Sequence, residues 1–103
     1  MPQHVIQILL PLSDNEGQPF SSSEYARVRS ELTERFGGMT AFTRGPAEGL
    51  WEENGKTARD DIVVFEVMTR ELDSSWWDRY RRTLENRFKQ DSIVVRAQEI
   101  LLL

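Results

Sequence analysis

Two amphipathic helical stripes, separated by strand-like runs, constrain the fold of this chain more than any other feature of its sequence. Apolar side chains recur at spacings of three and four residues, which is the pattern of a helix with one buried face. The first stripe contains Tyr25, Val28, Leu32 and Phe36, and the second contains Trp76, Trp77, Tyr80, Leu84 and Phe88. Ser21 with Glu24 predicts the start of the first helix, and Gly37-Gly38 predicts its end. Asp73, Ser74 and Ser75 offer N-cap oxygens for the second helix.

Four runs rich in β-branched and aromatic residues predict strands around these helices. They are Val5 to Leu10, Met39 to Arg44, Ile62 to Met68, and Ser92 to Ala97, the last with an extension toward Leu103 left open. Asn54–Gly55 favours a tight hairpin turn, so the second and third strands are expected to be antiparallel neighbours. The order β-α-β-β-α-β predicts an α+β fold, the ferredoxin-like βαββαβ sandwich. This fold implies a four-stranded antiparallel sheet in the order 4-1-3-2 with both helices on one face.

The chain has the size and composition of one globular domain, so residues 1–103 are expected to form a single ferredoxin-like unit. Hydrophobic residues make up 39% and charged residues 29%, which argues against disorder. A net charge of −4 disfavours nucleic-acid and anionic-membrane partners, so neither is predicted. No Lys or Arg precedes the first apolar stretch, and we expect a cytoplasmic protein.

Composition also limits the catalytic and metal-binding chemistry that the chain can perform. The sequence has no cysteine, which excludes thiolate catalysis and Cys-ligated zinc. It has one histidine, His4, which excludes a site that needs two imidazoles from one chain. The acidic residues at 52, 53, 60 and 61 do not have the spacing of a calcium-binding loop. The glycines at 45 and 49 lack the Lys and Ser or Thr of a phosphate-binding loop. We therefore predict no cofactor and no metal site, and no nucleophile with a nearby base identifies catalytic residues.

Side chains alternate between the two faces of a strand, which separates a helix-covered face from an open face. The set assigned to the core contains Ile6, Ile8, Leu10, Val63, Phe65, Val67, Ile93, Val95 and Ala97. The opposite set contains Val5, Gln7, Leu9, Thr40, Phe42, Arg44, Ile62, Val64, Glu66, Met68, Val94, Arg96 and Gln98. This second set is too apolar for a bare surface, so we expect a homodimer through the open sheet face, assisted by the tail Ile100–Leu103. The alternative is a monomer in which the Trp51 loop or the tail folds over the sheet.

The polar residues of the open face are expected to form a row across the sheet: Arg96, Gln7, Glu66 and either Arg44 or Thr40. Charged groups in an apolar setting must be paired and hydrogen-bonded. The row therefore has two interpretations, an ion-pair network that sets the register of a dimer or a site for a small-molecule ligand. In the second, Glu66 is an acid or base, and Arg44 or Arg96 holds an anionic substrate. Trp51 is either an anchor for its own loop or part of that site.

Three segments carry a further resemblance: Arg35-Phe-Gly-Gly-Met-Thr40 (FGG-x-T), Gly49-Leu-Trp51 (G-x-W), and the long strand from Asp61 to Met68. They resemble the corresponding segments of a group of small uncharacterised bacterial proteins with a ferredoxin-like order. That group has no established activity, so the resemblance implies no catalytic residues. The chain is also loosely similar to dimeric α/β-barrel proteins, in which two ferredoxin-like sandwiches pair their sheets. Some of those are cofactor-free monooxygenases or small isomerases and decomposition enzymes, and others bind ligands.

The sequence supports three functional hypotheses. The first is that the chain is a bacterial homodimer that binds a small molecule or is an accessory module. The second is a small cofactor-independent enzyme of the dimeric α/β-barrel type, monooxygenase- or isomerase-like, in which Glu66 is the acid or base and Arg44, Arg96 and Trp51 shape the pocket. The third is a purely structural protein-interaction domain. Whether the chain is an enzyme stays open at this point.

Overall fold

The computed structural model describes residues 3–44, 52–53, 56–57 and 62–103, and the side-chain descriptions below concern residues 3–41 and 62–103. Along the chain the elements are β1 (Gln3–Pro11), α1 (Ser22–Phe36), β2 (Thr40–Arg44), β3 (Glu52–Glu53), β4 (Lys56–Thr57), β5 (Ile62–Thr69), α2 (Ser74–Arg87) and β6 (Val94–Ile100). All predicted helices and strands are present at or within a few residues of their expected positions.

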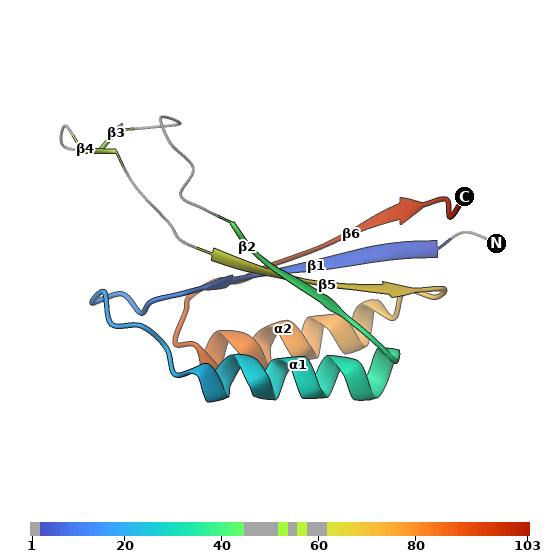
Figure 1. The fold of residues 1–103 in the computed structure, drawn as a ribbon, viewed down its shortest axis with the longest axis horizontal. Coiled ribbons are helices and arrows are strands. Elements are labelled where there is room, and N and C mark those ends of the chain that lie inside the picture. Colours follow the sequence, from blue (N-terminus) through green and yellow to red (C-terminus); the bar gives the residue numbers. More distant parts are fainter. Residues whose placement is uncertain (1–2, 45–51, 54–55, 58–61) are drawn as a thin grey trace.

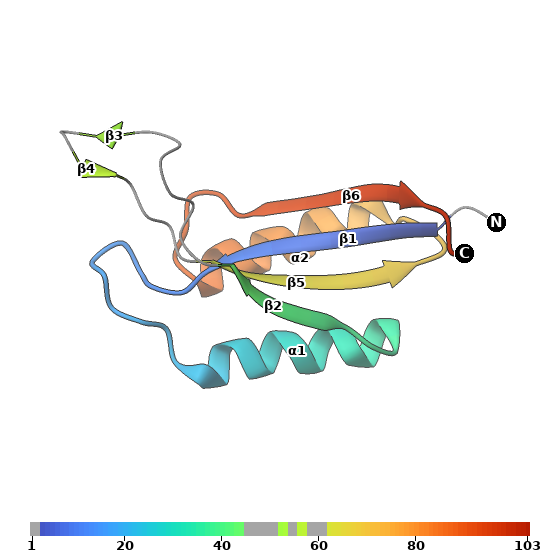
Figure 2. The same ribbon diagram turned by 45° about the horizontal axis from the view of Figure 1, so that its top comes forward.

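Four strands form one antiparallel sheet in the order β2-β5-β1-β6. Both helices cover one face of this sheet, and the opposite face carries no helix (Figure 1; Figure 2). This arrangement confirms the ferredoxin-like α+β sandwich, with the two most apolar strands, β1 and β5, in the centre. Strands β3 and β4 pair with each other in a separate hairpin around residues 54–55, which themselves lie outside the described residues.

Helix α1 begins and ends where local chemistry predicts. The Ser21 hydroxyl accepts a hydrogen bond from the backbone N–H of Ser23 at 3.2 Å, which satisfies one of the unpaired donors at a helix start. At the other end Gly37 has a φ of +80°, a left-handed conformation that glycine adopts without steric cost. Its N–H donates to the carbonyl of Thr33 at 2.8 Å. The residues of α1 that are buried are Val28 and Leu32, both in the predicted stripe.

Helix α2 carries the heavier aromatic stripe and runs antiparallel to α1. An Asp73 carboxylate oxygen accepts from the backbone N–H of Trp76 at 3.1 Å and caps the helix start. The Trp77 ring stacks on Phe36 near the end of α1, with centroids 5.4 Å apart. Phe88, just after α2, contacts Tyr25 near the start of α1 at 5.6 Å. These contacts join the two helices at both ends through apolar rings.

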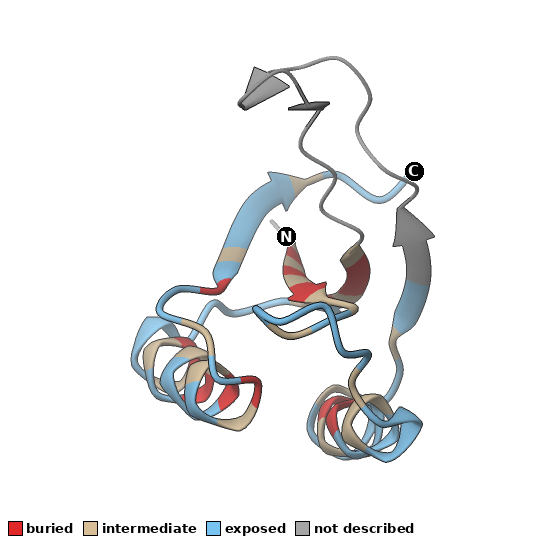
Figure 3. Ribbon diagram, turned by 90° about the vertical axis from the view of Figure 1, so that its left-hand side faces the viewer, coloured by how far each residue is buried: buried red, intermediate tan, exposed pale blue. Residues whose placement is uncertain are grey.

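The core lies between the helices and the covered face of the sheet. Its buried side chains are Ile6, Ile8, Leu10, Val28, Leu32, Val63, Phe65, Val67, Trp77, Tyr80, Leu84, Phe88 and Ile93. One predicted core residue, Ala97, is exposed and was wrongly assigned. The reason is that the edge strand β6 rises away from the helix layer toward its C-terminal end (Figure 1), so it is exposed over most of its length (Figure 3).

Polar contacts reinforce the helix layer. The Arg87 guanidinium, whose side chain is 9% exposed, donates to both Glu31 carboxylate oxygens at 2.7 and 3.1 Å. The Tyr80 hydroxyl donates to the same carboxylate at 2.9 Å. The hydrogen bond from Arg87 lowers the pKa of Glu31, whereas burial and the neighbouring Glu31 carboxylate raise the pKa of Tyr80. The result is a cross-helix clamp from α2 to α1.

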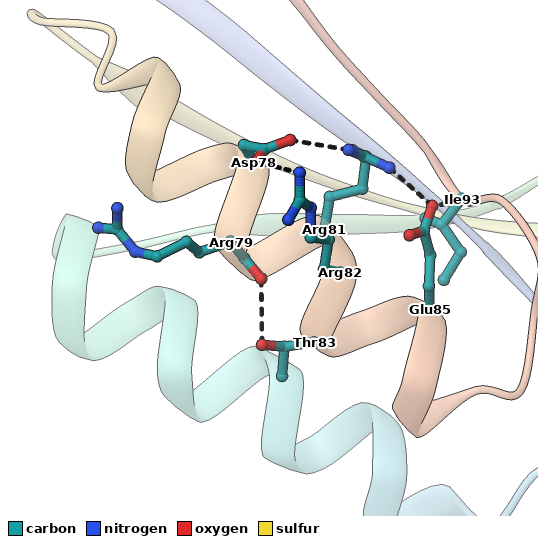
Figure 4. A network of polar contacts seen from close by, with 7 residues as sticks. All are labelled: Asp78, Arg79, Arg81, Arg82, Thr83, Glu85 and Ile93. Carbon is teal, nitrogen blue, oxygen red and sulfur yellow. Dashed lines mark hydrogen bonds and ion pairs between the residues drawn. The ribbon is translucent and has the colours of Figure 1, made fainter.

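A second polar network ties α2 to the beginning of β6. Arg81 donates to Asp78 at 2.8 Å and to Glu85 at 2.9 Å (Figure 4). One Glu85 oxygen also accepts the backbone N–H of Ile93 at 3.0 Å, and this contact leads the causes that lower the pKa of Glu85. The end of the loop between α2 and β6 is therefore tied to α2 at Ile93. Within the described part of the chain, neither helix has the length and apolar character needed to cross a bilayer.

Candidate functional site

A row of polar residues crosses the open face of the sheet, as the sequence predicts. Strand pairing places Gln7 of β1 between Glu66 of β5 and Arg96 of β6. On the outer side of β5, Thr40 of β2 is the partner of Glu66. The row therefore reads Thr40, Glu66, Gln7, Arg96, with one residue from each of the four strands.

The side chains of three of these residues form a directed chain of hydrogen bonds. The Arg96 Nε–H donates to Gln7 Oε1 at 2.9 Å. The Gln7 Nε2–H donates to Glu66 Oε1, also at 2.9 Å. Because a guanidinium only donates and a carboxylate only accepts, the two charged neighbours determine which way the Gln7 amide points. A positive and a negative group are thus held at a fixed separation by a neutral bridge.

The row is reachable from solvent in the chain as described. Gln7 and Glu66 are half-buried and Arg96 is exposed. Within the described residues, the Glu66 carboxylate accepts one side-chain hydrogen bond, which the Gln7 Nε2–H donates to Glu66 Oε1. A carboxylate has capacity for several donors, so this one retains capacity for further hydrogen bonds.

Two open depressions flank the row. One, of about 360 Å³, lies against β1 and β6 and is lined by Val5, Gln7, Arg96, Ala97 and Gln98. The other, of about 350 Å³, lies where α1 leads into β2 and is lined by Phe36, Gly37, Gly38, Met39, Thr40, Glu66, Val67 and Met68. Glu66 and Gln7 separate the two. A ligand in either depression would contact a charged member of the row.

The apolar part of the open face is only partly exposed. Met68 and Val94 are 53% and 51% exposed, and Leu101, Leu102 and Leu103 are more exposed still. Val64, in contrast, is 1% exposed although the pleat places it on this face. The single chain therefore covers some of this face by itself and leaves the remainder open.

One predicted site residue, Arg44, stands apart from the row. The backbone of Arg44 pairs with Ile62, four residues away from the Thr40 position, or about 13 Å along the strand. Of the two alternatives for the fourth member of the row, Thr40 is thus correct and Arg44 is wrong. The Arg44 side chain and the whole of Trp51 lie outside the described residues.

The described residues contain no cluster of three or more His, Asp or Glu side chains placed to hold a metal ion. His4 is near the beginning of β1, paired with Thr69 on one side and Glu99 on the other. Its Nδ1 atom is buried and has no hydrogen-bond partner within the same part of the chain.

Sequence reasoning missed a cleft at one end of the sandwich. This cleft, of about 530 Å³, lies between the β1–α1 loop and the α2–β6 loop, with Asp14 in the first loop and Ser92 in the second. The only signal in the sequence was a polar run, Ser13-Asp14-Asn15, directly after an apolar strand. Nothing in that run indicates that residues almost eighty positions later form the opposite wall.

No family model and no curated protein matches this sequence. Among solved structures, the chain is similar to a phage SAM lyase in complex with S-methyl-5′-thioadenosine, with a TM-score of 0.63 and 15% sequence identity. The match covers 94% of this chain and 81% of the lyase chain. At that level of identity the similarity demonstrates a shared fold.

Proposed function

We propose that this protein is a small-molecule-binding module whose ligand lies on the open sheet face, in contact with Glu66 and Arg96. The observation that carries the proposal is the directed hydrogen-bond chain from Arg96 through Gln7 to Glu66 on a face that solvent reaches. Small-molecule sites characteristically combine apolar walls with a few oriented polar groups. Here the walls come from Val5 and Met68, and the oriented groups are a guanidinium and a carboxylate.

The solved lyase supports this proposal at the level of the fold, since a protein with the same architecture holds a small molecule. A polar row that served only to join subunits would need no open depressions on both of its sides. For the same reason we assign the row to a ligand rather than to the register of a dimer.

Native mass spectrometry of protein purified gently from its own host tests the proposal. We expect a reproducible additional mass on the wild-type chain and its loss from Glu66→Gln and Arg96→Gln. Glu66→Gln keeps an oxygen that can accept from Gln7, so the sheet is expected to stay intact. Glu99→Gln, which removes one exposed carboxylate from the same strand as Arg96, is the matched control and is expected to retain the mass. Equal retention by Glu66→Gln and wild type would contradict the assignment.

We also propose that a second copy of the chain covers the remaining open face. The exposed Met68 and Val94 side chains, with the leucines at 101–103, supply apolar surface of the kind that soluble proteins bury in partners. The same spectra report the number of chains. A dimer that becomes a monomer in Met68→Glu is the expected result, and a monomeric wild type would contradict it.

An enzymatic role for Glu66 is the second candidate, favoured by the capacity of its carboxylate for further donors and by the lyase that shares the fold. A general acid or base must be reachable by substrate, and the half-buried Glu66 carboxylate meets this condition because it lines one of the depressions. Incubation with SAM, followed by mass spectrometry for its loss and for S-methyl-5′-thioadenosine, tests this directly. We expect turnover of SAM that disappears in Glu66→Gln. An unchanged SAM concentration with the wild-type chain would refute SAM cleavage by Glu66.

A further inference from the structure

The cleft between the β1–α1 loop and the α2–β6 loop has the size of a ligand site. Its volume of about 530 Å³ is within the range of about 300–1,000 Å³ typical for small-molecule pockets. The two loops lie side by side at the same end of the sandwich (Figure 1; Figure 2). Its floor contains Leu9 and Val94, which are paired across β1 and β6 and belong to the open face.

The wall formed by the β1–α1 loop is held in one conformation by Asp14. Its Oδ1 accepts the backbone N–H groups of Glu16 and Gln18, each at 2.9 Å. The Asp14 N–H donates to the Gln18 carbonyl at 2.8 Å, which closes the loop. Oδ2 makes no hydrogen bond to any described residue. One oxygen of a half-buried carboxylate thus organises the loop, and the other is left to accept from a ligand.

The opposite wall is held in a similar way. Gln90 Nε2 donates to the Phe88 carbonyl at 3.0 Å, which leaves the Gln90 side-chain oxygen as an acceptor. The hydrogen bond from the Ile93 N–H to Glu85 ties the next turn of the loop to α2 (Figure 4). Ser92 lies between these two anchored residues and lines the cleft.

The polar groups of the cleft are therefore rich in acceptors. Asp14 Oδ2 and the Gln90 oxygen accept, the hydroxyls of Ser13 and Ser92 do either, and the Asn15 amide has both an acceptor and donors. A complementary ligand must bring donors to Asp14. Among the described residues of the lining, Asp14 is the one that carries a charge, so an anionic ligand would be repelled. Neutral hydroxyl groups satisfy both conditions, and a carboxylate is the group that commonly receives the hydroxyls of a ribose.

The apolar floor of the cleft indicates the chemistry of the other half of the ligand. Val94 is 51% exposed beside Leu9, which offers an apolar surface to a flat ring. The cleft lies close to the polar row, because Leu9 and Val94 are two residues along their strands from Gln7 and Arg96. That separation is about 7 Å along the strands, so one small molecule can reach both.

We propose, building on the function proposed above, that the ligand of the open face is a neutral nucleoside-type molecule, and that its hydroxyls bind in this cleft with Asp14 as the principal acceptor. The flat ring lies over Val94 and Leu9, and the opposite end of the molecule faces Arg96 and Glu66.

Adenosine is the probe, because it joins a flat ring to a pair of adjacent hydroxyls and carries no charge. Its affinity is measured by calorimetry, and its position by amide chemical shifts in ¹⁵N-labelled protein. We expect shifts in the Asp14 and Ser92 loops and affinity reduced at least about tenfold in Asp14→Asn, as the loss of a hydrogen bond to a charged acceptor predicts. The oxygen of the introduced amide still accepts from residues 16 and 18, so the loop conformation is preserved.

Glu16→Gln is the matched control, since it removes one exposed carboxylate from the same loop without lining the cleft. We expect it to bind adenosine within about twofold of wild type, a difference below the effect of one hydrogen bond. With the wild-type chain, 2′-deoxyadenosine and adenosine monophosphate are both expected to bind more weakly than adenosine. Ser92→Ala provides a second variant if Asp14→Asn does not fold, and it too is expected to weaken binding.

The outcomes separate this inference from the proposed function. Adenosine binding that depends on Glu66 but not on Asp14 would overturn the cleft and leave the function standing. Binding that depends on Asp14 but not on Glu66 would support the cleft and contradict the function assigned to the row. No binding of adenosine to the wild-type chain would overturn the inference, while the co-purified mass still tests the function independently.

Discussion

Replacement of Glu31 by alanine should show how much the cross-helix clamp contributes to stability. The change removes two hydrogen bonds from Arg87, at 2.7 and 3.1 Å, and one from Tyr80 at 2.9 Å. The Arg87 side chain is only 9% exposed, so water cannot replace its lost partner fully. Breaking a buried ion pair costs about 3–5 kcal/mol. The Glu31 carboxylate is 36% exposed, however, and solvent reaches this side of the pair, so we expect a cost of about 2–3 kcal/mol.

Urea unfolding at pH 7, followed by the fluorescence of the tryptophans in α2, measures this cost. Arg27→Ala is the control, because Arg27 is 63% exposed and its ion pair with Glu31 is 3.9 Å long. We expect that control to change stability by about 0–1 kcal/mol. In the double variant Glu31→Ala with Arg87→Met, no guanidinium is left without a partner, so part of the stability should return. A Glu31→Ala chain as stable as the Arg27→Ala chain would refute the clamp.

Three other predictions concern the pH dependence of stability, the truncation of a core leucine and the backbone conformation of a glycine. The pKa of Glu31 is lowered in the folded state, so its contribution to stability is complete above its ordinary value of 4.5 and is lost as the pH falls through the folded-state value. The stability difference between wild type and Glu31→Ala, measured by urea midpoints, should therefore be constant above pH 4.5 and narrow as the pH falls below it. Leu84→Ala should cost about 2–5 kcal/mol, since Leu84 is fully buried, whereas Leu72→Ala, at a side chain 40% exposed, should cost less than about 0.5 kcal/mol by the same assay. Gly37→Ala should cost about 1–2 kcal/mol of stability because Gly37 has a φ of +80°, although an added methyl group meets no atom within 4 Å. Gly38→Ala is the control, since Gly38 has equal space and no positive φ. Equal thermal midpoints for the two variants would show that backbone conformation is not the cause.

The sequence was sufficient to predict the architecture because each element carries a local signal. The helix stripes with their caps at Ser21 and Gly37, and the alternation in β1 and β5, depend on residues a few positions apart. Once the order of elements is known, the right-handed crossover rule leaves few topologies to choose from. The helix-covered core followed from that topology, apart from Ala97 at the end of an edge strand.

The site was predicted less completely, because register is a property of two strands at once. The alternation placed Gln7, Glu66 and Arg96 on one face, but it left Thr40 and Arg44 as equal candidates for the same row. A shift of four residues along β2 keeps every side chain on its face, so the apolar pattern does not distinguish the two alignments. The pairing of Thr40 with Glu66 decides the question.

Sequence alone therefore determined the class of fold, the identity of the core strands and the presence of charged residues on an open face, since periodicity and capping are local properties of the chain. Only the tertiary structure decided that Arg96, Gln7 and Glu66 form one directed hydrogen-bond chain and that the Asp14 loop faces Ser92 across a cleft. Those contacts join residues that are 59 to 89 positions apart in the hydrogen-bonded row, and their geometry depends on how strands twist and where loops end. Such properties arise when distant segments pack together, and no local pattern in the sequence records them.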